Sequence, residues 1–316
     1  MSQECFVGID VSKDTLHVAT QPATRQRVFP NSEAGWAELL AHLTTLQPAL
    51  VVLEASGGYE MHVACFLAHE GFPVVIANPK HARDFARSLG LLAKTDRLDA
   101  KMLARFALAV RPEPRPLPDA ETLAFKALVA RRGDLVAMRT AEVNRLQAPL
   151  TEPVRDGIAE HIAWLDARIK DLDRELRERV DSNAAWHEKD QLLQSVPGIA
   201  DVTSHKLLAD LTELGDANRH QAANLVGVAP LNRDSGTLRG HQSIWGGRAS
   251  VRCALYMATL SALRWNPDIR AFYQRLRAAG KPFKLAMTAA MRKLLLLLNS
   301  VLRRGTPWRP SSPQNA

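Results

Sequence analysis

The chain has 316 residues, of which 46 % are apolar and 23 % are charged, a balance typical of folded globular proteins with about two domains. Its three cysteines are far apart and include no Cys-x-x-Cys pair, which argues against a disulfide framework and a structural zinc site. The N-terminus lacks a signal-peptide pattern, and Arg292 and Lys293 interrupt the apolar stretch 285–302. We therefore expect a cytoplasmic protein with no membrane contact.

The positive charge is concentrated toward the C-terminus. The net charge of the chain is +8. Residues 231–316 hold 15 Lys and Arg against two Asp, a net charge of +13, whereas residues 1–230 have a net charge of −5. This asymmetry indicates that the last third binds a polyanion such as nucleic acid, although a solvated basic face is the alternative.

Residues 1–110 alternate between strand and helix patterns. Apolar runs and alternation predict two strands within 4–20, joined by a turn at 12–14, and a third strand near 27–30. Further strands are predicted at 49–53 and 73–77, and helices at 33–43, 59–70, 81–89 and 96–110. This order predicts one domain over residues 1–110 with an α/β layer architecture.

The rest of the chain is predicted to be all-α. A proline-rich hinge at 111–119 opens a segment over 111–185, whose two long helices fit either an antiparallel coiled-coil hairpin or a plain bundle. A domain over 186–305 begins with a helix-hairpin-helix-like element, whose Pro197-Gly198 turn can present backbone N–H groups to phosphate. A Gly-rich loop at 233–250 and three helices follow. The Pro/Ser-rich tail 306–316 is predicted to be disordered.

Four carboxylates stand where separate elements can converge. Asp10 and Glu54 each end a predicted strand, and Asp96 and Asp99 lie i, i+3 on one helix face. Clustered carboxylates repel one another unless a cation neutralises them. Oxygen ligands favour Mg²⁺ or Mn²⁺, and two such ions can clamp the attacking and leaving oxygens of a phosphodiester. Taken singly, each acid is also well explained as a turn residue or a helix cap.

The order and spacing of GIDVSK, LEASGGYE and KTDRLDA resemble the RuvC/RNase H-like nuclease fold. With VPGI, NLVGVAPLNRDSGTLRG and WGGR further along, nearly the whole chain resembles the DEDD-type insertion-sequence transposases, the Piv-like family of bridge-RNA-guided recombinases. The resemblance implies a RuvC-like N-terminal domain and a mainly helical C-terminal transposase domain. It also implies that Asp10, Glu54, Asp96 and Asp99 are the metal-binding catalytic set and that Ser235 is the nucleophile.

The implied chemistry cuts and rejoins DNA without a nucleotide cofactor. A phosphoserine link at Ser235 would conserve the energy of the broken bond, which agrees with the lack of GxGxxG and GxxxxGK phosphate loops. Asp-Ser-Gly is also a common turn composition, and Ser243 and Ser250 compete with Ser235 for the role. Six basic residues are candidate phosphate contacts: Arg233, Arg239, Arg248, Lys281, Lys284 and Arg292.

The resemblance further implies the partners and the location of the protein. The partners are donor and target DNA, a non-coding guide (bridge) RNA encoded by the element, and further copies of the chain, as a homodimer that assembles into a tetramer on DNA. The location is the bacterial cytoplasm, in association with the nucleoid. Two alternatives stay open. One is a metal-dependent Holliday-junction-type nuclease without a covalent intermediate, and the other is a non-catalytic nucleic-acid-binding protein.

Overall fold

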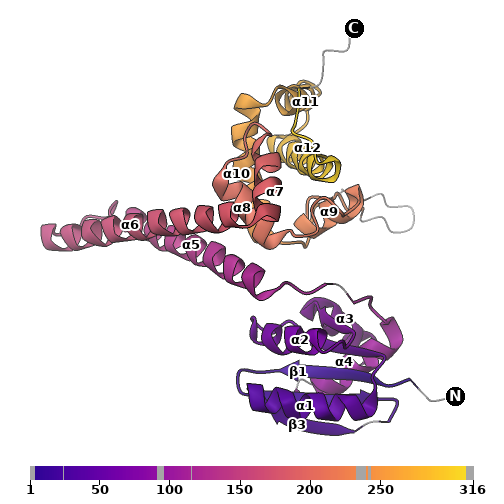
Figure 1. Ribbon diagram of the computed structural model, residues 1–316. Coiled ribbons are helices and arrows are strands. Elements are labelled where there is room, and N and C mark those ends of the chain that lie inside the picture. Colours follow the sequence, from indigo (N-terminus) through magenta and orange to yellow (C-terminus); the bar gives the residue numbers. More distant parts are fainter. Residues whose placement is uncertain are drawn as a thin grey trace. The chain divides into compact units, whose positions relative to one another are not determined.

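The computed structural model describes residues 4–23, 25–90, 96–114, 116–232, 240 and 243–310, and of residues 96–98 only the backbone. The chain forms two compact units, unit 1 over residues 1–120 and unit 2 over residues 121–316. Figure 1 shows the helices and strands of each unit. Unit 1 is a mixed α/β structure and unit 2 is helical, which confirms the predicted order of an α/β part followed by an all-α part.

Unit 1 is built on a five-stranded mixed sheet with the strand order β3-β2-β1-β4-β5. An antiparallel meander comes first, followed by two strands that run parallel to β1. The strands are β1 (Phe6–Val11), β2 (Thr15–Gln21), β3 (Gln26–Pro30), β4 (Leu50–Glu54) and β5 (Val74–Ala77). The helices are α1 (Glu33–Leu46), α2 (Tyr59–His69), α3 (Pro79–Ser88) and α4 (Asp96–Val110).

Helices cover both faces of the sheet, which explains why β1 and β4 are apolar almost throughout. On one face, Ile9 of β1 belongs to a buried cluster with residues of α1 and α2, such as Leu39 and Leu67. On the other face, Phe6 of β1 belongs to a cluster with residues of α3 and α4, such as Leu103. Because successive residues of a strand point to opposite faces, even-numbered residues of β1 point toward α4.

Gly8 lets α4 lie directly on β1. A Cβ at Gly8 would lie 2.2 Å from the amide nitrogen of Ala104 and 2.4 Å from the carbonyl oxygen of Ala100. Both atoms belong to the backbone of α4, so no side-chain rotation could relieve the clash. Ala19 of β2, the cross-strand partner of Gly8, packs against the same two alanines. Small residues on all three elements thus set the distance between helix and sheet.

Unit 1 extends through most of the proline-rich segment that was predicted to be a hinge. Leu117 packs against the buried cluster on the α1 and α2 face. The Cys65 thiol of α2 donates a 3.5 Å hydrogen bond to the carbonyl of Pro118. These contacts explain why the boundary between the compact units falls after Ala120, ten residues beyond the predicted end of the first domain.

Unit 2 begins with an antiparallel hairpin of two long helices. Arg132 and Arg139 lie seven residues apart on the first helix and pair with Asp173 and Asp166 on the second, with Nη2–Oδ2 distances of 3.2 and 3.3 Å. Each of these partly exposed pairs adds little stability, but a seven-residue spacing on both helices fixes their register. The helices are α5 (Ala120–Arg145) and α6 (Glu152–Ser182).

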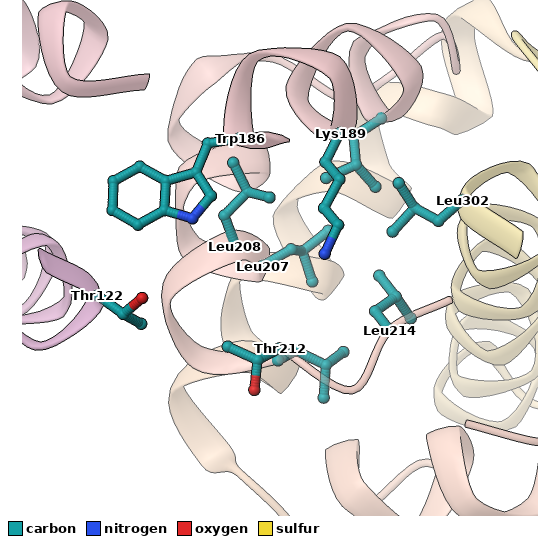
Figure 2. A pocket seen from close by; sticks show the side chains of 10 residues that line it. Thr122, Trp186, Lys189, Leu207, Leu208, Thr212, Leu214 and Leu302 are labelled. Atoms are coloured by element: carbon teal, nitrogen blue, oxygen red, sulfur yellow. The ribbon is translucent and has the colours of Figure 1, made fainter. Parts of the chain in front are cut away.

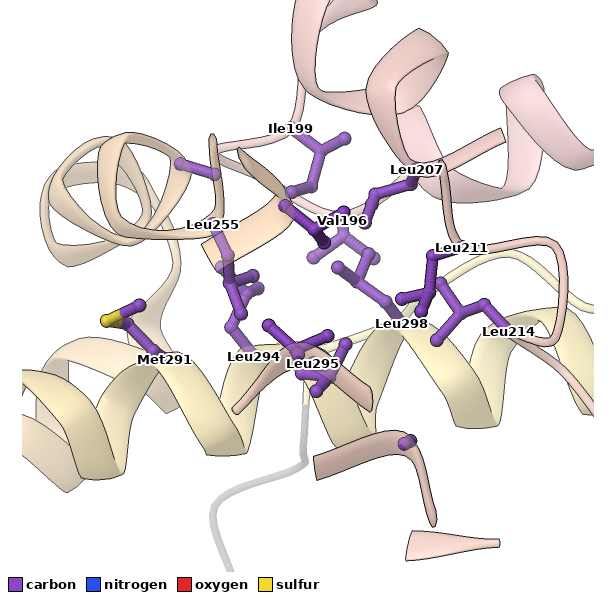
Figure 3. Close-up of a cluster of buried hydrophobic side chains, with 14 of the residues drawn as sticks. Val196, Ile199, Leu207, Leu211, Leu214, Leu255, Met291, Leu294, Leu295 and Leu298 are labelled. Atoms are coloured by element: carbon purple, nitrogen blue, oxygen red, sulfur yellow. The ribbon is translucent and has the colours of Figure 1, made fainter. Parts of the chain in front are cut away.

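The other helices of unit 2 enclose a single large apolar core. They are α7 (Ala184–Gln194), α8 (Asp201–Asp210), α9 (Arg219–Val226), α10 (Ala249–Trp265), α11 (Pro267–Ala278) and α12 (Phe283–Arg304). Figure 3 shows part of this core, where Leu294, Leu295 and Leu298 of α12 meet Leu255 of α10 and Leu207 of α8. Burial of these side chains is the main driving force for packing the helices together.

By length and mean hydropathy alone, α12 is long and apolar enough to cross a membrane. Half of its most apolar window is buried inside the protein, however, and its leucines fill the core of unit 2. A helix buried in a protein core can be equally long and apolar, so the position of α12 in the core of unit 2 explains its composition.

The Pro197-Gly198 turn packs inside unit 2. The structure confirms the predicted helix, turn and helix as α7 and α8. A Cβ at Gly198 would lie 2.6 Å from the amide nitrogen of Ala262 in α10, and Val196 and Ile199 on either side of the turn are buried. The turn therefore serves the packing of α10, which leaves little room for the phosphate contact suggested by the sequence.

The first part of the predicted disordered tail is also packed. Trp308 lies against the apolar core of unit 2, and its backbone N–H donates a 2.8 Å hydrogen bond to Ser195 Oγ. The large apolar surface of the tryptophan explains why this Pro-rich segment returns to the core. Residues 311–316 lie outside the described residues.

A small cavity of about 60 Å³ lies between α5, α7, α8 and α12 (Figure 2). It is lined mostly by apolar side chains, including Trp186, Leu207 and Leu302, with Lys189 as its charged member. It holds none of the predicted catalytic residues, and its volume is far below the roughly 300 Å³ of a typical small-molecule site.

Replacing Gly8 with alanine is expected to destabilise unit 1 by about 1–3 kcal/mol, because the added methyl group must displace the backbone of α4. Gly133 in α5 is the matched control, since a Cβ there meets no atom within 4 Å. Gly133→Ala should stabilise the helix by about 0.5–1 kcal/mol. Urea unfolding followed by circular dichroism measures both changes. Equal stability of Gly8→Ala and wild type would contradict this role of Gly8.

Candidate active site

Asp10 lies at the end of β1, on the face that α4 covers. It is two residues beyond Gly8, and residues two apart on a strand point to the same side. Its parallel neighbour is the end of β4, because Gly8 pairs with Val52 and Ile9 with Leu53. The next step of this register brings Glu54 beside Asp10. The two predicted carboxylates therefore sit side by side at the carboxyl edge of the sheet.

α4 brings a third carboxylate to the same edge. The helix runs antiparallel to β1, since Ala100 near its start lies over Gly8, whereas Arg111 just after its end lies 4.9 Å from the ring centre of Phe6. Asp99 directly precedes Ala100 in the first turn of the helix. Its position is thus at the carboxyl end of β1. Asp96 begins α4, but its side chain lies outside the described residues.

The structure places these acids at one edge of the sheet, but the side chains that it describes do not form a metal-binding group. Among the residues that the structure describes, no three His, Cys, Asp or Glu side chains are placed to hold a metal ion together. Asp10, Glu54 and Asp99 each interact with another group of the protein. As a donor set, carboxylate oxygens from β1, β4 and α4 suit a hard divalent cation such as Mg²⁺ or Mn²⁺.

Glu60 holds the loop that follows Glu54, a role that was not predicted. Its side chain is only 5 % exposed, and Oε2 accepts hydrogen bonds of 2.9 Å from the backbone N–H groups of both Ser56 and Gly58. An acid in the first turn of α2 also suits the positive end of the helix dipole. The signal was present in LEASGGYE, as an acid four residues after the serine that begins the turn.

His17 is a second neighbour that was not predicted. It is the antiparallel cross-strand partner of Asp10 and therefore points to the same face of the sheet. Directly opposed residues have Cβ atoms about 4.5–5.5 Å apart, so the imidazole stands beside the Asp10 carboxylate. The alternation in 15–21 predicts the strand, but only the pairing register shows which of its residues faces Asp10.

Ser235 lies outside the described residues, as do Arg233 and Arg239. The structure does describe the two ends of their loop. Leu231 and Ser243 form an isolated antiparallel bridge, with N–H to O distances of 3.0 and 3.2 Å. The described residues on either side of the Ser235 segment therefore meet at one place in unit 2.

Arg248 has a structural role in unit 2. Its guanidinium forms two hydrogen bonds of 2.6 Å to the carboxylate of Glu213 and a third of 2.9 Å to the carbonyl of Asp210. The hydrogen bonds to Glu213 raise the pKa of Arg248 further above its already high range. This bidentate pair ties the end of the Gly-rich loop to α8 and its following turn, so we do not retain Arg248 as a phosphate contact.

The other basic candidates lie around α12. Lys281 and Lys284 are exposed at the N-terminal end of the helix, and Arg292 is half-buried along it. Lys281 and Lys284 are thus accessible to an anion, whereas the Nε of Arg292 is buried within unit 2.

Comparison with known proteins identifies both halves of the chain. A DEDD-type IS110 family model described as a transposase matches residues 7–153. A second model, described as the transposase IS116/IS110/IS902 family, matches residues 190–274. The first match includes the four predicted acids, and the second includes Ser235.

Relatives match along nearly the full length. The chain is 29 % identical to the pilin gene-inverting protein of Moraxella lacunata, over 96 % of this chain and 97 % of that protein. It is 28 % identical to the protein of the same name from Moraxella bovis, with the same coverage. It is also 23 % identical to the transposase for insertion sequence element IS1111A of Coxiella burnetii, over 73 % of this chain and 70 % of that protein.

These matches follow the order of the predicted motifs and extend across both compact units. The mixed sheet with its edge of acids lies in the first matched region, and the helical core of unit 2 lies in and around the second. The chain is therefore a DNA transposase or recombinase that belongs to the IS116/IS110/IS902 family of transposases.

Proposed function

We propose that this transposase cuts and rejoins DNA through a covalent link between Ser235 and a DNA phosphate, assisted by a divalent metal at the carboxylates of unit 1. The observation that carries the proposal is the convergence of Asp10, Glu54 and Asp99 at one sheet edge, within the region that matches the DEDD-type family model. The meander followed by two parallel strands supports an RNase H/RuvC-like assignment for unit 1.

In the proposed first step, Ser235 Oγ attacks a backbone phosphorus and loses its proton. The bond from phosphorus to the 3′ oxygen breaks, and this oxygen takes up a proton to become a free 3′-hydroxyl. The other side of the break stays joined to Ser235 as a phosphoserine. A 3′-hydroxyl of the partner strand then attacks the same phosphorus and releases the serine. Bond energy is conserved throughout, so no nucleotide cofactor is needed.

Membership of a DEDD-type family suggests dependence on a divalent metal. Asp10, Glu54, Asp96 and Asp99 would hold it, and their oxygen donors favour Mg²⁺, with Mn²⁺ as a substitute. When bound, the metal would polarise the scissile phosphate and stabilise the charge that develops on its oxygens. Glu60 holds the loop after Glu54 through two backbone hydrogen bonds, and His17 lies opposite Asp10 on the neighbouring strand.

The acids and Ser235 belong to different units, and we propose that they act together in an assembled complex. The proposed assembly is a homodimer that forms a tetramer on donor and target DNA, guided by an element-encoded RNA, in the bacterial cytoplasm. The α5–α6 hairpin is the proposed dimer contact, because it exposes large apolar side chains. Those at least one-third exposed include Val136, Met138, Val154 and Trp164, and clusters of this kind mark contact surfaces.

Ser235→Ala should abolish a covalent protein–DNA adduct while leaving DNA binding unchanged, because only the nucleophilic oxygen is lost. The adduct is measured on a denaturing gel with labelled donor and target DNA, Mg²⁺, and RNA transcribed from the DNA that flanks the gene. Ser243→Ala is the matched control and should keep the adduct. Cleaved DNA without an adduct in wild type would favour a hydrolytic nuclease, and loss of the adduct in Ser243→Ala alone would move the nucleophile to Ser243.

Asp10→Asn should weaken Mn²⁺ binding by at least about 10- to 100-fold. Ligand binding to the folded state raises the melting temperature, so Mn²⁺ should stabilise wild type in a thermal-shift assay and stabilise Asp10→Asn far less. Without metal, Asp10→Asn should melt slightly higher than wild type, because one repulsive charge is gone. Asp14→Asn, in the turn after β1, is the control and should respond like wild type. An equal response to Mn²⁺ in all three proteins would exclude a metal at Asp10.

Trp164→Arg should convert the dimer to a monomer, because it places a charge in the proposed apolar contact on α6. The molar mass from light scattering after gel filtration measures the change. Trp265→Arg is the control, since Trp265 is 71 % exposed at the end of α10, a helix that is not part of the hairpin. A dimer that survives Trp164→Arg, or one that is lost in both variants, would rule out this face.

A further inference from the structure

Helix α3 carries a stripe of positive charge on its exposed side. Its sequence, PKHARDFARS, places Lys80, Arg83 and Arg87 at i, i+3 and i+7, on one helix face, and all three are exposed. The one acid of the helix, Asp84, forms an exposed 3.4 Å pair with Arg87, which screens little of the charge. The opposite face is apolar, with Ala82 buried against the sheet.

This stripe starts next to the proposed catalytic edge. β5 runs parallel to β4, and its last residue, Ala77, is the register partner of Glu54. Asn78 then caps α3, and its side chain accepts a hydrogen bond from the N–H of Lys80. The helix therefore begins two residues beyond the partner of a proposed metal ligand.

α3 also packs firmly against α4, the helix that places Asp99 at the carboxyl edge of the sheet. Phe85 packs edge-on against Phe106 of α4, with ring centres 5.4 Å apart. Ala82 and Ala86 fill the rest of the contact with α4 and the sheet. The basic stripe and the acids are thus fixed relative to each other within unit 1.

The charge at the start of α3 is opposite to the charge that would stabilise this end of the helix. The N-terminus of a helix carries a partial positive charge, which favours acids there and disfavours bases. The first turn of α3 has no acid, and Lys80 stands in it. Cations at this end add to the helix dipole, so they make the surface attractive to an anion.

Taking the proposed function as its basis, we propose that the Lys80, Arg83 and Arg87 stripe of α3 binds the phosphate backbone of the DNA strand that the unit 1 carboxylates act on. From Lys80 to Arg87 the helix rises about 10 Å, and phosphates of one duplex strand follow every 3.4 Å or so along the axis, so the stripe matches about three of them. DNA is the occupant favoured over RNA, because the stripe begins at the edge where the cut strand must lie.

The test measures how DNA binding by the full-length protein depends on salt, with EDTA present so that no cutting occurs. The probe is a fluorescein-labelled 30-base-pair duplex. Each lost phosphate contact lowers the slope of log affinity against log salt by about 0.9, so Arg83→Gln/Arg87→Gln should lower it by about 1.8 and weaken binding several-fold at low salt. Arg83→Lys/Arg87→Lys keeps both charges and should keep the slope.

Arg25→Gln/Arg27→Gln is the matched control, because it removes two exposed charges at β3, the opposite edge of the sheet from β5. Its slope should equal that of wild type. The inference is overturned if Arg83→Gln/Arg87→Gln keeps the wild-type slope, or if the control loses as much. It is also overturned if the loss appears with RNA from the flanking DNA and not with the duplex.

The adduct assay on wild type separates failure of this inference from failure of the proposed function. A wild-type adduct together with an unchanged slope in Arg83→Gln/Arg87→Gln would overturn only the role of α3. If wild type cuts DNA but forms no adduct, the phosphoserine proposal fails, whereas a reduced slope would still place the backbone on α3. Circular dichroism melting of each variant tests whether a change in slope comes from unfolding.

Discussion

The contact between Gly8 and the backbone of α4 decides where the acids of unit 1 lie. Because no side chain intervenes, the helix rests on the sheet through Ala100 and Ala104, and its first turn reaches the carboxyl end of β1. Asp99 lies at the carboxyl edge of the sheet because it directly precedes Ala100, the residue of α4 that rests on Gly8. A larger helix–sheet distance would separate it from Asp10 and Glu54. The site thus depends on a residue that takes no part in the chemistry.

Much of the fold follows from local patterns. β1 and β4 of unit 1 are apolar runs because helices cover both faces of the sheet. Helices α1 and α3 begin with the caps Ser32 and Asn78, whose side chains accept hydrogen bonds from the first turn. Asp10 and Glu54 were identifiable because each ends such a run. His17 was not, because its relation to Asp10 comes from cross-strand register. Glu60 was not, because its role lies in two backbone hydrogen bonds formed only when the loop closes.

The positive charge of residues 231–316 illustrates how composition can mislead about contacts. A net charge of +13 in residues 231–316 suggests many phosphate ligands, yet part of it serves the fold. Arg303 donates to the carbonyls of Asp216 and Ala217, and Arg252 donates to those of Val226 and Gly246. These guanidinium groups satisfy backbone oxygens at turns and helix ends. The excess charge that remains for a polyanion is smaller and more localised than the count implies.

The register of the α5–α6 hairpin has a consequence for geometry on DNA. α6 has 31 residues, so it extends roughly 46 Å, about the length of 14 base pairs. The Arg132–Asp173 and Arg139–Asp166 pairs prevent the two helices from sliding past each other. If two copies meet along such hairpins on DNA, the length and register of the hairpin set how far the two copies of unit 2 extend along the duplex.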